Sequence, residues 1–217
     1  GKVAEVSGLD GGQALEDSLV QTVKEKVLSL PGGKEFLQKF EDKQTLIKLD
    51  HKLQNGEDLT KEELSFLYEL DRPIATLDTY NSEDPRITEL KEKYGIEHAL
   101  EKGVDANKLV SSLKIGDIAS NLDTFLEHGA DINNVVRKMY SYNVIRNLDY
   151  LLNHGADIDN IVSNMKPNDI ANKLGFLLNH GADVNNVIKN LDEEDIKNNI
   201  DLLRKYGAKL DTYQGNN

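Results

Sequence analysis

Three histidines recur at a constant interval of 26 residues, at His128, His154 and His180. Imidazole nitrogens are common metal ligands, so this column is a candidate metal site. Each histidine stands directly before a glycine, however, where its ring can bond the free carbonyl groups of a helix end. Stacked repeats lie roughly 10 Å apart, too far for the rings to converge on one ion. We therefore interpret them as helix-end residues and predict no metal site.

A parallel column of aspartates follows each glycine by two residues, at Asp131, Asp157 and Asp183. Such carboxylates could chelate calcium or attract a basic partner, but no DxDxDG loop accompanies them. Aspartate is also a preferred residue at helix starts, and this capping role is the interpretation we favour. In the same phrases, the alternative caps are Asn133, Asp159 and Asn185.

No sequence motif indicates catalysis. The chain has no cysteine, no GxSxG, no GxGxxG and no P-loop, and His51 and His98 have no suggestive neighbours. We therefore expect no catalytic residues and no cofactor. An enzyme whose site is assembled from residues distant in sequence is kept as a third hypothesis.

These columns belong to a repeat that fills the C-terminal half of the chain. Copies occupy residues 95–120, 121–146, 147–172 and 173–198, and a truncated copy starts at residue 199. Each copy predicts two helices. The copy at 173–198 serves as the example. Apolar residues at i, i+4, i+7 and i+8, beginning at residue 170, indicate its first helix, and a narrower apolar stripe further along indicates a shorter second helix. The first stripe comprises Ile170, Leu174, Leu177 and Leu178, and the second comprises Val187, Ile188 and Leu191.

One such hairpin cannot bury both of its helices, so the copies must stack. The sequence therefore predicts an all-α fold, an α-hairpin repeat solenoid of five 26-residue units. The LLNHGAD phrases at 151–157 and 177–183 resemble the helix-to-loop segment of ankyrin repeats. Ankyrin repeats are about 33 residues long and open with TPLHxA, so this is an ankyrin-like variant. The resemblance implies stacked hairpins and a protein-binding role.

The N-terminal half predicts further helices. Apolar spacing indicates a helix over 13–29, and a charged stretch over 34–54 ends at Asn55-Gly56. Thr60 and Glu63 form a capping box for a helix through Leu70, and Asp84-Pro85 starts another that runs to about Tyr94. We expect residues 1–93 to be a helical region that caps the array and residues 94–217 to be the repeats. Residues 59–90 resemble uncharacterised bacterial proteins with an FLYE-type motif, a resemblance that implies no chemistry.

Charge and composition limit the partners. With 38 acidic and 26 basic residues the net charge is −12, and neither half is basic, which argues against nucleic acid. The longest apolar runs fall far short of the roughly 20 residues of a membrane helix, so we predict no membrane contact. The absence of cysteine suits a reducing compartment, and we expect a cytoplasmic protein.

Variable positions on the repeat are the candidate binding residues. Tyr140 and Tyr142 occupy the turn between repeats in one copy only, and Tyr150 and Phe176 occupy a varying position five residues before the glycine. Repeat proteins present recognition surfaces through such variation, and aromatic residues favour interface hot spots. The alternative is that Tyr150 and Phe176 widen the apolar stripe of the core. The favoured function is a non-catalytic protein-binding module whose partner has a basic or mixed surface, and the alternative is a structural spacer of a larger bacterial protein.

Overall fold

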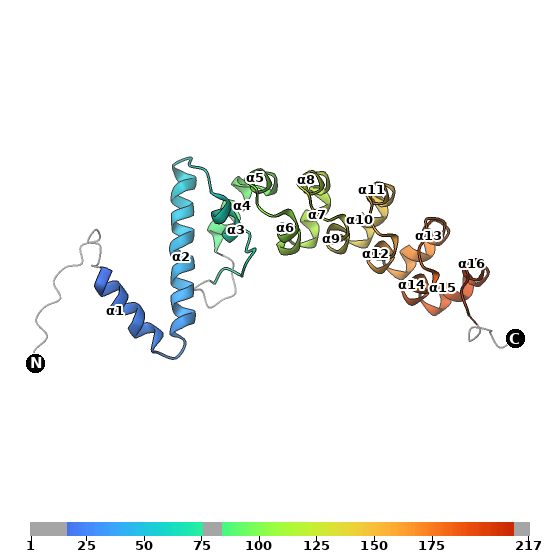
Figure 1. Ribbon diagram of the computed structural model, residues 1–217, viewed down its shortest axis with the longest axis horizontal. Coiled ribbons are helices and arrows are strands. Elements are labelled where there is room, and N and C mark those ends of the chain that lie inside the picture. The colour runs from blue at the N-terminus through green and yellow to red at the C-terminus, as the bar shows by residue number, and fades with distance from the viewer. Residues whose placement is uncertain (1–16, 76–83, 211–217) are drawn as a thin grey trace, which may run out of the picture. The chain divides into compact units, whose positions relative to one another are not determined.

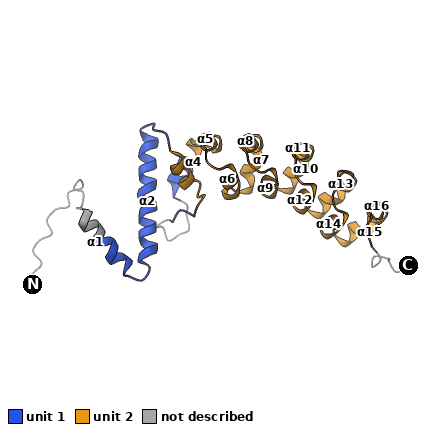
Figure 2. Ribbon diagram, viewed as in Figure 1, with its two compact units in different colours: residues 1–59, 73–90 blue, residues 60–72, 91–217 orange. Residues whose placement is uncertain are grey.

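Helices are the only regular secondary structure in residues 17–75 and 84–210, the parts of the chain that this computed structural model describes. The prediction of an all-helical protein is therefore confirmed (Figure 1). Two compact units comprise residues 1–59 with 73–90, and residues 60–72 with 91–217 (Figure 2). Segment 60–72 thus groups with the repeats. The division into a capping region and a repeat region stays a prediction. Within the described residues, no helix is both long and apolar enough to cross a bilayer.

The first unit contains a helical hairpin. Helix α1 (Asp17–Leu28) packs against α2 (Gly33–Gln54). Their contact requires a glycine at the start of α2, because a Cβ on Gly33 would lie 1.7 Å from the carbonyl oxygen of Val27. Helix α1 agrees with the predicted first helix over its described part, while residues 13–16 lie outside the described residues. Helix α2 spans the whole charged stretch that precedes Asn55.

Helix α3 (Lys61–Leu67) belongs to the second unit and begins at the predicted capping box. The Thr60 hydroxyl accepts the N–H of Glu63 at 3.3 Å, and the Glu63 carboxylate accepts the N–H of Thr60 at 2.8 Å. The sequence predicts a helix through Leu70, but α3 ends at Leu67. The reason is that Glu69 adopts a left-handed φ of 57°, which no helix can continue through.

The predicted caps recur along the repeats, the aspartate in the four complete copies and the glycine in all five. Each second helix starts at an aspartate whose carboxylate accepts a backbone N–H of the first turn, and these are Asp105, Asp131, Asp157 and Asp183. Each first helix is followed by a glycine with φ between 80° and 92°, a backbone conformation that a side chain would strain. Both predictions are confirmed. The helices are α4 (Pro85–Lys93), α5 (Ile96–Glu101), α6 (Ala106–Ser112), α7 (Ile115–Ser120), α8 (Leu122–Glu127), α9 (Ile132–Arg137), α10 (Ser141–Arg146), α11 (Leu148–Asn153), α12 (Ile158–Ser163), α13 (Pro167–Asn179), α14 (Val184–Lys189), α15 (Glu193–Asn198) and α16 (Ile200–Lys205).

The first helix is divided in three of the copies, whereas the apolar spacing predicts one continuous helix. An asparagine stands at each break, with φ between −120° and −109°. Its side-chain amide donates to the carbonyl oxygen four residues earlier at 2.8–2.9 Å, a bond that competes with the backbone bonds of the helix. Of the two other copies, the first has Gly95 at the equivalent position, between α4 and α5, and the fourth has Lys173, where α13 runs unbroken. The asparagines are Asn121, Asn147 and Asn199.

Equivalent residues of successive copies form the core of the second unit. The second helices lie side by side, α6 against α9, α9 against α12 and α12 against α14. Two columns of apolar side chains from the first helices are at most 2% exposed, and each such side chain contributes about 1.5–3 kcal/mol on burial. The core therefore continues from each copy into the next. The columns are Ile118, Val144, Ile170, Ile196 and Phe125, Leu151, Leu177, Leu203.

A ladder of hydrogen bonds also joins neighbouring copies. The residue two positions after each N-cap accepts, through Oδ1, the backbone N–H of the next copy's N-cap aspartate at 2.8–2.9 Å. The same oxygen accepts a side-chain amide of the next copy at 3.1–3.4 Å. We call the three acceptors the Asx ladder. Two of them, Asn133 and Asp159, are alternative caps by sequence, and the structure assigns them this inter-copy role instead. The acceptors of the Asx ladder are Asn107, Asn133 and Asp159.

Candidate protein-binding surface

A surface hollow in the second unit contains two of the four predicted binding residues. Tyr140 and Tyr142 lie on its wall at the start of α10. Its volume of about 470 Å³ falls in the range of roughly 300–1,000 Å³ that is usual for ligand pockets. Turns of three successive copies therefore meet here. The other lining residues are Ser141, Lys166, Pro167, Asn168, Asp169 and Asp192.

The two tyrosine rings stack on each other and remain open to solvent. Their centroids lie 5.7 Å apart with an angle of 16° between the ring planes. Tyr140 is 47% exposed and Tyr142 is 56% exposed. Offset stacking at this separation is a favoured aromatic arrangement. Exposed aromatic side chains of this kind often supply much of the binding energy of an interface.

The position of Tyr140 has no capping role in any copy. It is the N-cap of its helix, yet neither Tyr140 nor its equivalents Lys114, Lys166 and Asp192 makes a side-chain capping bond. This holds even for Asp192, although aspartate is among the best capping residues. Helix capping therefore does not dictate the residue type at this position, which leaves it open to variation.

Ser141 fastens two copies together beside the tyrosines, and the sequence analysis did not identify it. The side chain is only 9% exposed. Its hydroxyl donates to the Asp169 carboxylate at 2.6 Å and accepts the backbone N–H of Lys166 at 2.9 Å. These bonds tie the start of α10 to the start of α13, so they hold the shape of the hollow. No sequence signal marked it, because the equivalent positions carry three other, mutually different residues, Ile115, Pro167 and Glu193.

The other two predicted binding residues lie elsewhere, since neither Tyr150 nor Phe176 lines the hollow. Each ring is half-buried and stacks on the histidine one turn later, Tyr150 on His154 at 4.0 Å and Phe176 on His180 at 3.9 Å between centroids. The Tyr150 hydroxyl donates to Asp123 of the preceding copy. That hydrogen bond is the main cause that raises the pKa of Tyr150 to about 12. One face of each ring is therefore used within the protein, and a role in binding stays a prediction.

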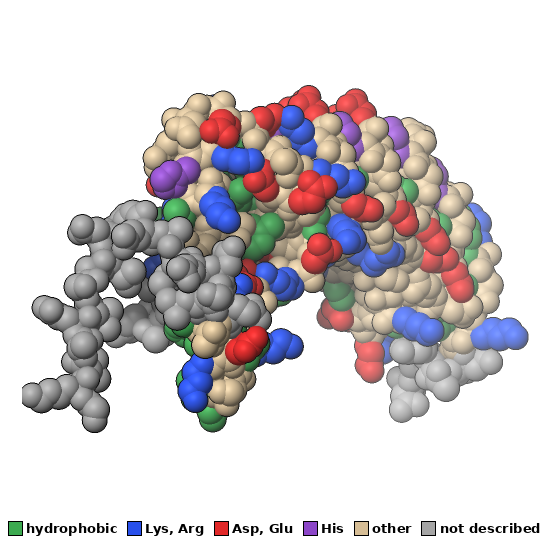
Figure 3. Space-filling model, turned by 60° about the vertical axis from the view of Figure 1, so that its left-hand side comes forward, with side chains coloured by type: hydrophobic (Ala, Val, Ile, Leu, Met, Phe, Trp, Pro, Cys, Tyr) green, Lys and Arg blue, Asp and Glu red, His purple; other side chains and the backbone are tan. Residues whose placement is uncertain are grey.

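The three repeat histidines close their helices, as predicted. Nδ1 of each ring lies 2.8–2.9 Å from the carbonyl oxygen four residues earlier, and a carbonyl only accepts, so Nδ1 carries the proton. Histidine side chains recur along one edge of the repeats in Figure 3, amid many acidic side chains. Within residues 17–75 and 84–210, no group of three or more His, Asp or Glu side chains is placed to hold a metal ion. The histidines are His128, His154 and His180.

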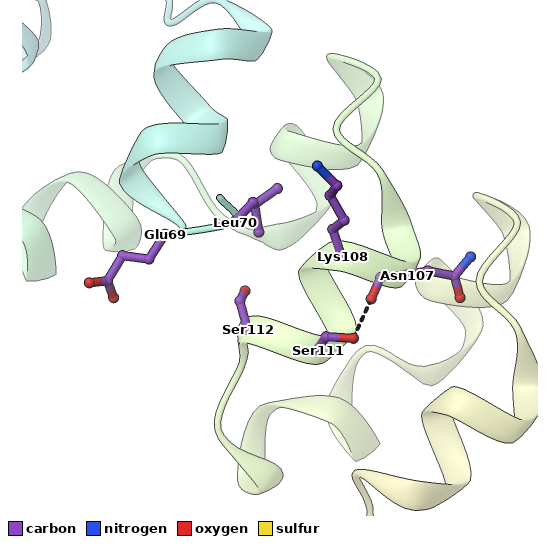
Figure 4. Close-up of a pocket in the computed structure, with 6 residues that line it drawn as sticks. All are labelled: Glu69, Leu70, Asn107, Lys108, Ser111 and Ser112. Carbon is purple, nitrogen blue, oxygen red and sulfur yellow. Dashed lines mark hydrogen bonds between the residues drawn. The ribbon is translucent and has the colours of Figure 1, made fainter. Parts of the chain in front are cut away.

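A second hollow, of about 430 Å³, lies between the segment after α3 and helix α6 (Figure 4). The carboxylate of Glu69 points away from α6, and the Ser111 hydroxyl donates to the backbone oxygen of Asn107 at 2.8 Å. Asn107 already serves in the Asx ladder, and no aromatic side chain lines this hollow. It is the weaker candidate. The sequence analysis did not identify it, and its lining residues, which have no motif, are Glu69, Leu70, Asn107, Lys108, Ser111 and Ser112.

The first unit exposes apolar side chains of its helical hairpin. Five of them are 45–54% exposed, and groups of this kind can mark interaction sites. None of the hollows described above involves them, so nothing defines the shape or chemistry of an occupant. They are Val23, Leu28, Leu30, Phe36 and Phe40.

Comparison of the chain with protein-family models, with curated proteins and with solved structures finds no match. The ankyrin-like character of the repeats therefore rests on the sequence resemblance alone. Function has to be argued from the surface geometry.

Proposed function

We propose that this chain is a non-catalytic protein-binding module, in which the copies stack as an ankyrin-like α-hairpin solenoid with residues 1–93 as its helical cap. The observation that carries the proposal is the stacked, exposed pair Tyr140 and Tyr142 beside a hollow shared by three copies. The core columns and the Asx ladder support the stacking, because both pass from one copy to the next. A rigid array of this kind presents side chains without losing much conformational entropy on binding.

The proposed partner is another protein with a basic or mixed surface. A net charge of −12 favours such a partner and disfavours nucleic acid. The tyrosine pair favours a protein as well, since tyrosine is enriched at the centres of protein interfaces. The absence of cysteine supports a cytoplasmic location.

The test is affinity capture from a bacterial lysate, with two double variants beside the parent chain. Tyr140→Ser with Tyr142→Ser removes the aromatic pair. Phe36→Ser with Phe40→Ser removes two similarly exposed rings from the first unit and is the matched control, since these rings are 52% and 45% exposed. Circular dichroism establishes that both variants keep their helices.

We expect the tyrosine variant to lose a captured protein that the phenylalanine variant retains. Removing two hot-spot rings should weaken binding by at least 2 kcal/mol, roughly thirtyfold. Equal capture by all three proteins would refute the role of the pair. Loss of the captured protein only in the phenylalanine variant would show that the binding surface lies on α2.

The structural spacer is the second candidate, and the regularity of the Asx ladder favours it. Three successive junctions use the same hydrogen bonds, so the array sets a length whether or not it binds anything. Absence of any protein captured by the parent chain would favour this function. An enzyme with a site assembled from distant residues is the third candidate.

A further inference from the structure

We infer that the hollow beside Tyr140 and Tyr142 receives an arginine side chain from a basic segment of the partner. This inference rests on the proposed function and specifies the chemistry of its ligand. It depends on three features of the hollow, namely a flat aromatic wall, an excess of carboxylates and a carboxylate with unused acceptors.

The aromatic wall suits a flat cation. The two rings stack with each other at 16°, and both are exposed to solvent. A ring face that is turned away from the other tyrosine is therefore available for a third planar group. A guanidinium is planar and weakly hydrated, and it stacks on tyrosine faces. A compact ammonium gains less, because it cannot lie flat against the ring and is more strongly hydrated.

The charges of the hollow favour a cation. Its lining residues include two carboxylates, Asp169 and Asp192, and one ammonium, Lys166. The hollow lies at helix starts, where backbone N–H groups attract anions, but Asp169 already supplies negative charge to the first turn of α13. A phosphate or an acidic segment would therefore meet repulsion from both aspartates.

Asp192 is the carboxylate with unused acceptors. It is exposed, it makes no capping bond, and no hydrogen bond or ion pair joins its side chain to another described residue. Asp169, in contrast, is half-buried and accepts the Ser141 hydroxyl at 2.6 Å. The forked donors of a guanidinium match a free carboxylate well, so Asp192 is the expected partner of the arginine and Asp169 adds to the local charge.

The test is titration with three fluorescein-labelled peptides, Gly-Arg-Gly-Arg-Gly and its matched forms with lysine or citrulline in place of arginine. Fluorescence polarisation gives the affinity, and amide NMR shifts locate the site. We expect the arginine peptide to bind about two- to fivefold more tightly than the lysine peptide, since one exposed cation–π contact contributes roughly 0.5–1 kcal/mol. Citrulline keeps the shape but not the charge, so that peptide should bind weakest.

Three variants separate the contributions. Tyr140→Leu with Tyr142→Leu keeps apolar bulk but removes the ring faces, and should reduce the preference for arginine over lysine to the part that pairing with Asp192 supplies. Asp192→Asn should weaken the arginine peptide severalfold, whereas Glu194→Gln, the same change of charge at an exposed residue outside the hollow, should not. Equal losses from Asp192→Asn and Glu194→Gln would overturn the inference, because binding would then follow overall charge.

The proposed function can survive failure of this inference. If a protein partner is lost from the Tyr140→Ser, Tyr142→Ser variant but arginine peptides bind no better than citrulline peptides, the protein-binding function stands and the arginine site is wrong. Tighter binding of a proline-rich peptide that depends on the tyrosine rings would have the same meaning. If neither partner capture nor peptide binding depends on the tyrosines, both proposals fail.

Discussion

Removal of one acceptor of the Asx ladder should loosen a single junction between copies. Asn133 accepts the backbone N–H of Asp157 at 2.9 Å and the side-chain amide of Asn160 at 3.4 Å. A hydrogen bond contributes about 0.5–1.5 kcal/mol net, and the second of these is long. We therefore expect Asn133→Ala to lower the free energy of unfolding by about 1–2 kcal/mol, measured by urea unfolding followed by circular dichroism.

Two variants make this measurement specific. Asn133→Asp keeps the acceptor and should change stability by less than about 0.5 kcal/mol, because Asp159 already fills the equivalent position with the same bonds. Asn185→Ala makes the same substitution in the last complete copy, where the side chain bonds only Asp183 of its own copy. Any gain in helix propensity from alanine is then common to both alanine variants and cancels. Equal losses for Asn133→Ala and Asn185→Ala would show that the ladder does not stabilise the junction.

Three further variants address the core, the helix breaks and the tyrosine hydroxyl. Leu151→Ala should cost about 2–5 kcal/mol in the same urea assay, because the side chain is 0% exposed. A loss below about 1 kcal/mol would contradict its place in the core. Asn147→Lys should join α10 and α11 into one helix, as in α13 with Lys173, and amide hydrogen exchange should show new protection at the break. Asp123→Asn should lower the pKa of Tyr150 from about 12 toward 10.0 in an absorbance titration. Since folding raises this pKa, the stability that the bond supplies is present below pH 10 and is lost as the pH rises through about 12. An unchanged titration would refute the assigned hydrogen bond.

The features that the sequence predicts correctly are those decided by neighbours along the chain. The glycine that follows each first helix and the aspartate that starts each second helix need only a few adjacent backbone groups. The capping box at Thr60 and Glu63 is equally local. The repeat then multiplies each correct assignment, because the same residue types return at the same positions.

The missed features depend on a choice between competing bonds or on contact with another copy. Asn147 can continue a helix or bond the carbonyl of Asn143, and apolar spacing does not reveal which bond forms. Ser141 is an ordinary helix-start residue until the fold brings Asp169 beside it. The hollow itself is formed by turns of three copies, so no single copy contains its pattern. Four binding residues could be proposed from variation between copies. Whether Tyr140 and Tyr142 share a surface with Tyr150 and Phe176 depends on how the copies pack, which the sequence does not reveal.

The Asx ladder also bears on how such an array can change in length during evolution. Each copy supplies a side-chain acceptor to the next copy, and the backbone N–H of its own N-cap aspartate donates to the copy before it. The pairs Asn133 with Asp157 and Asp159 with Asp183 show this arrangement. Duplication of one whole 26-residue unit creates a junction that is already complete, with no compensating substitution. An insertion within a helix that is not a whole number of units shifts the donor away from its acceptor and rotates the apolar face of the residues that follow. Tandem duplication is therefore the change of gene length that this architecture tolerates best.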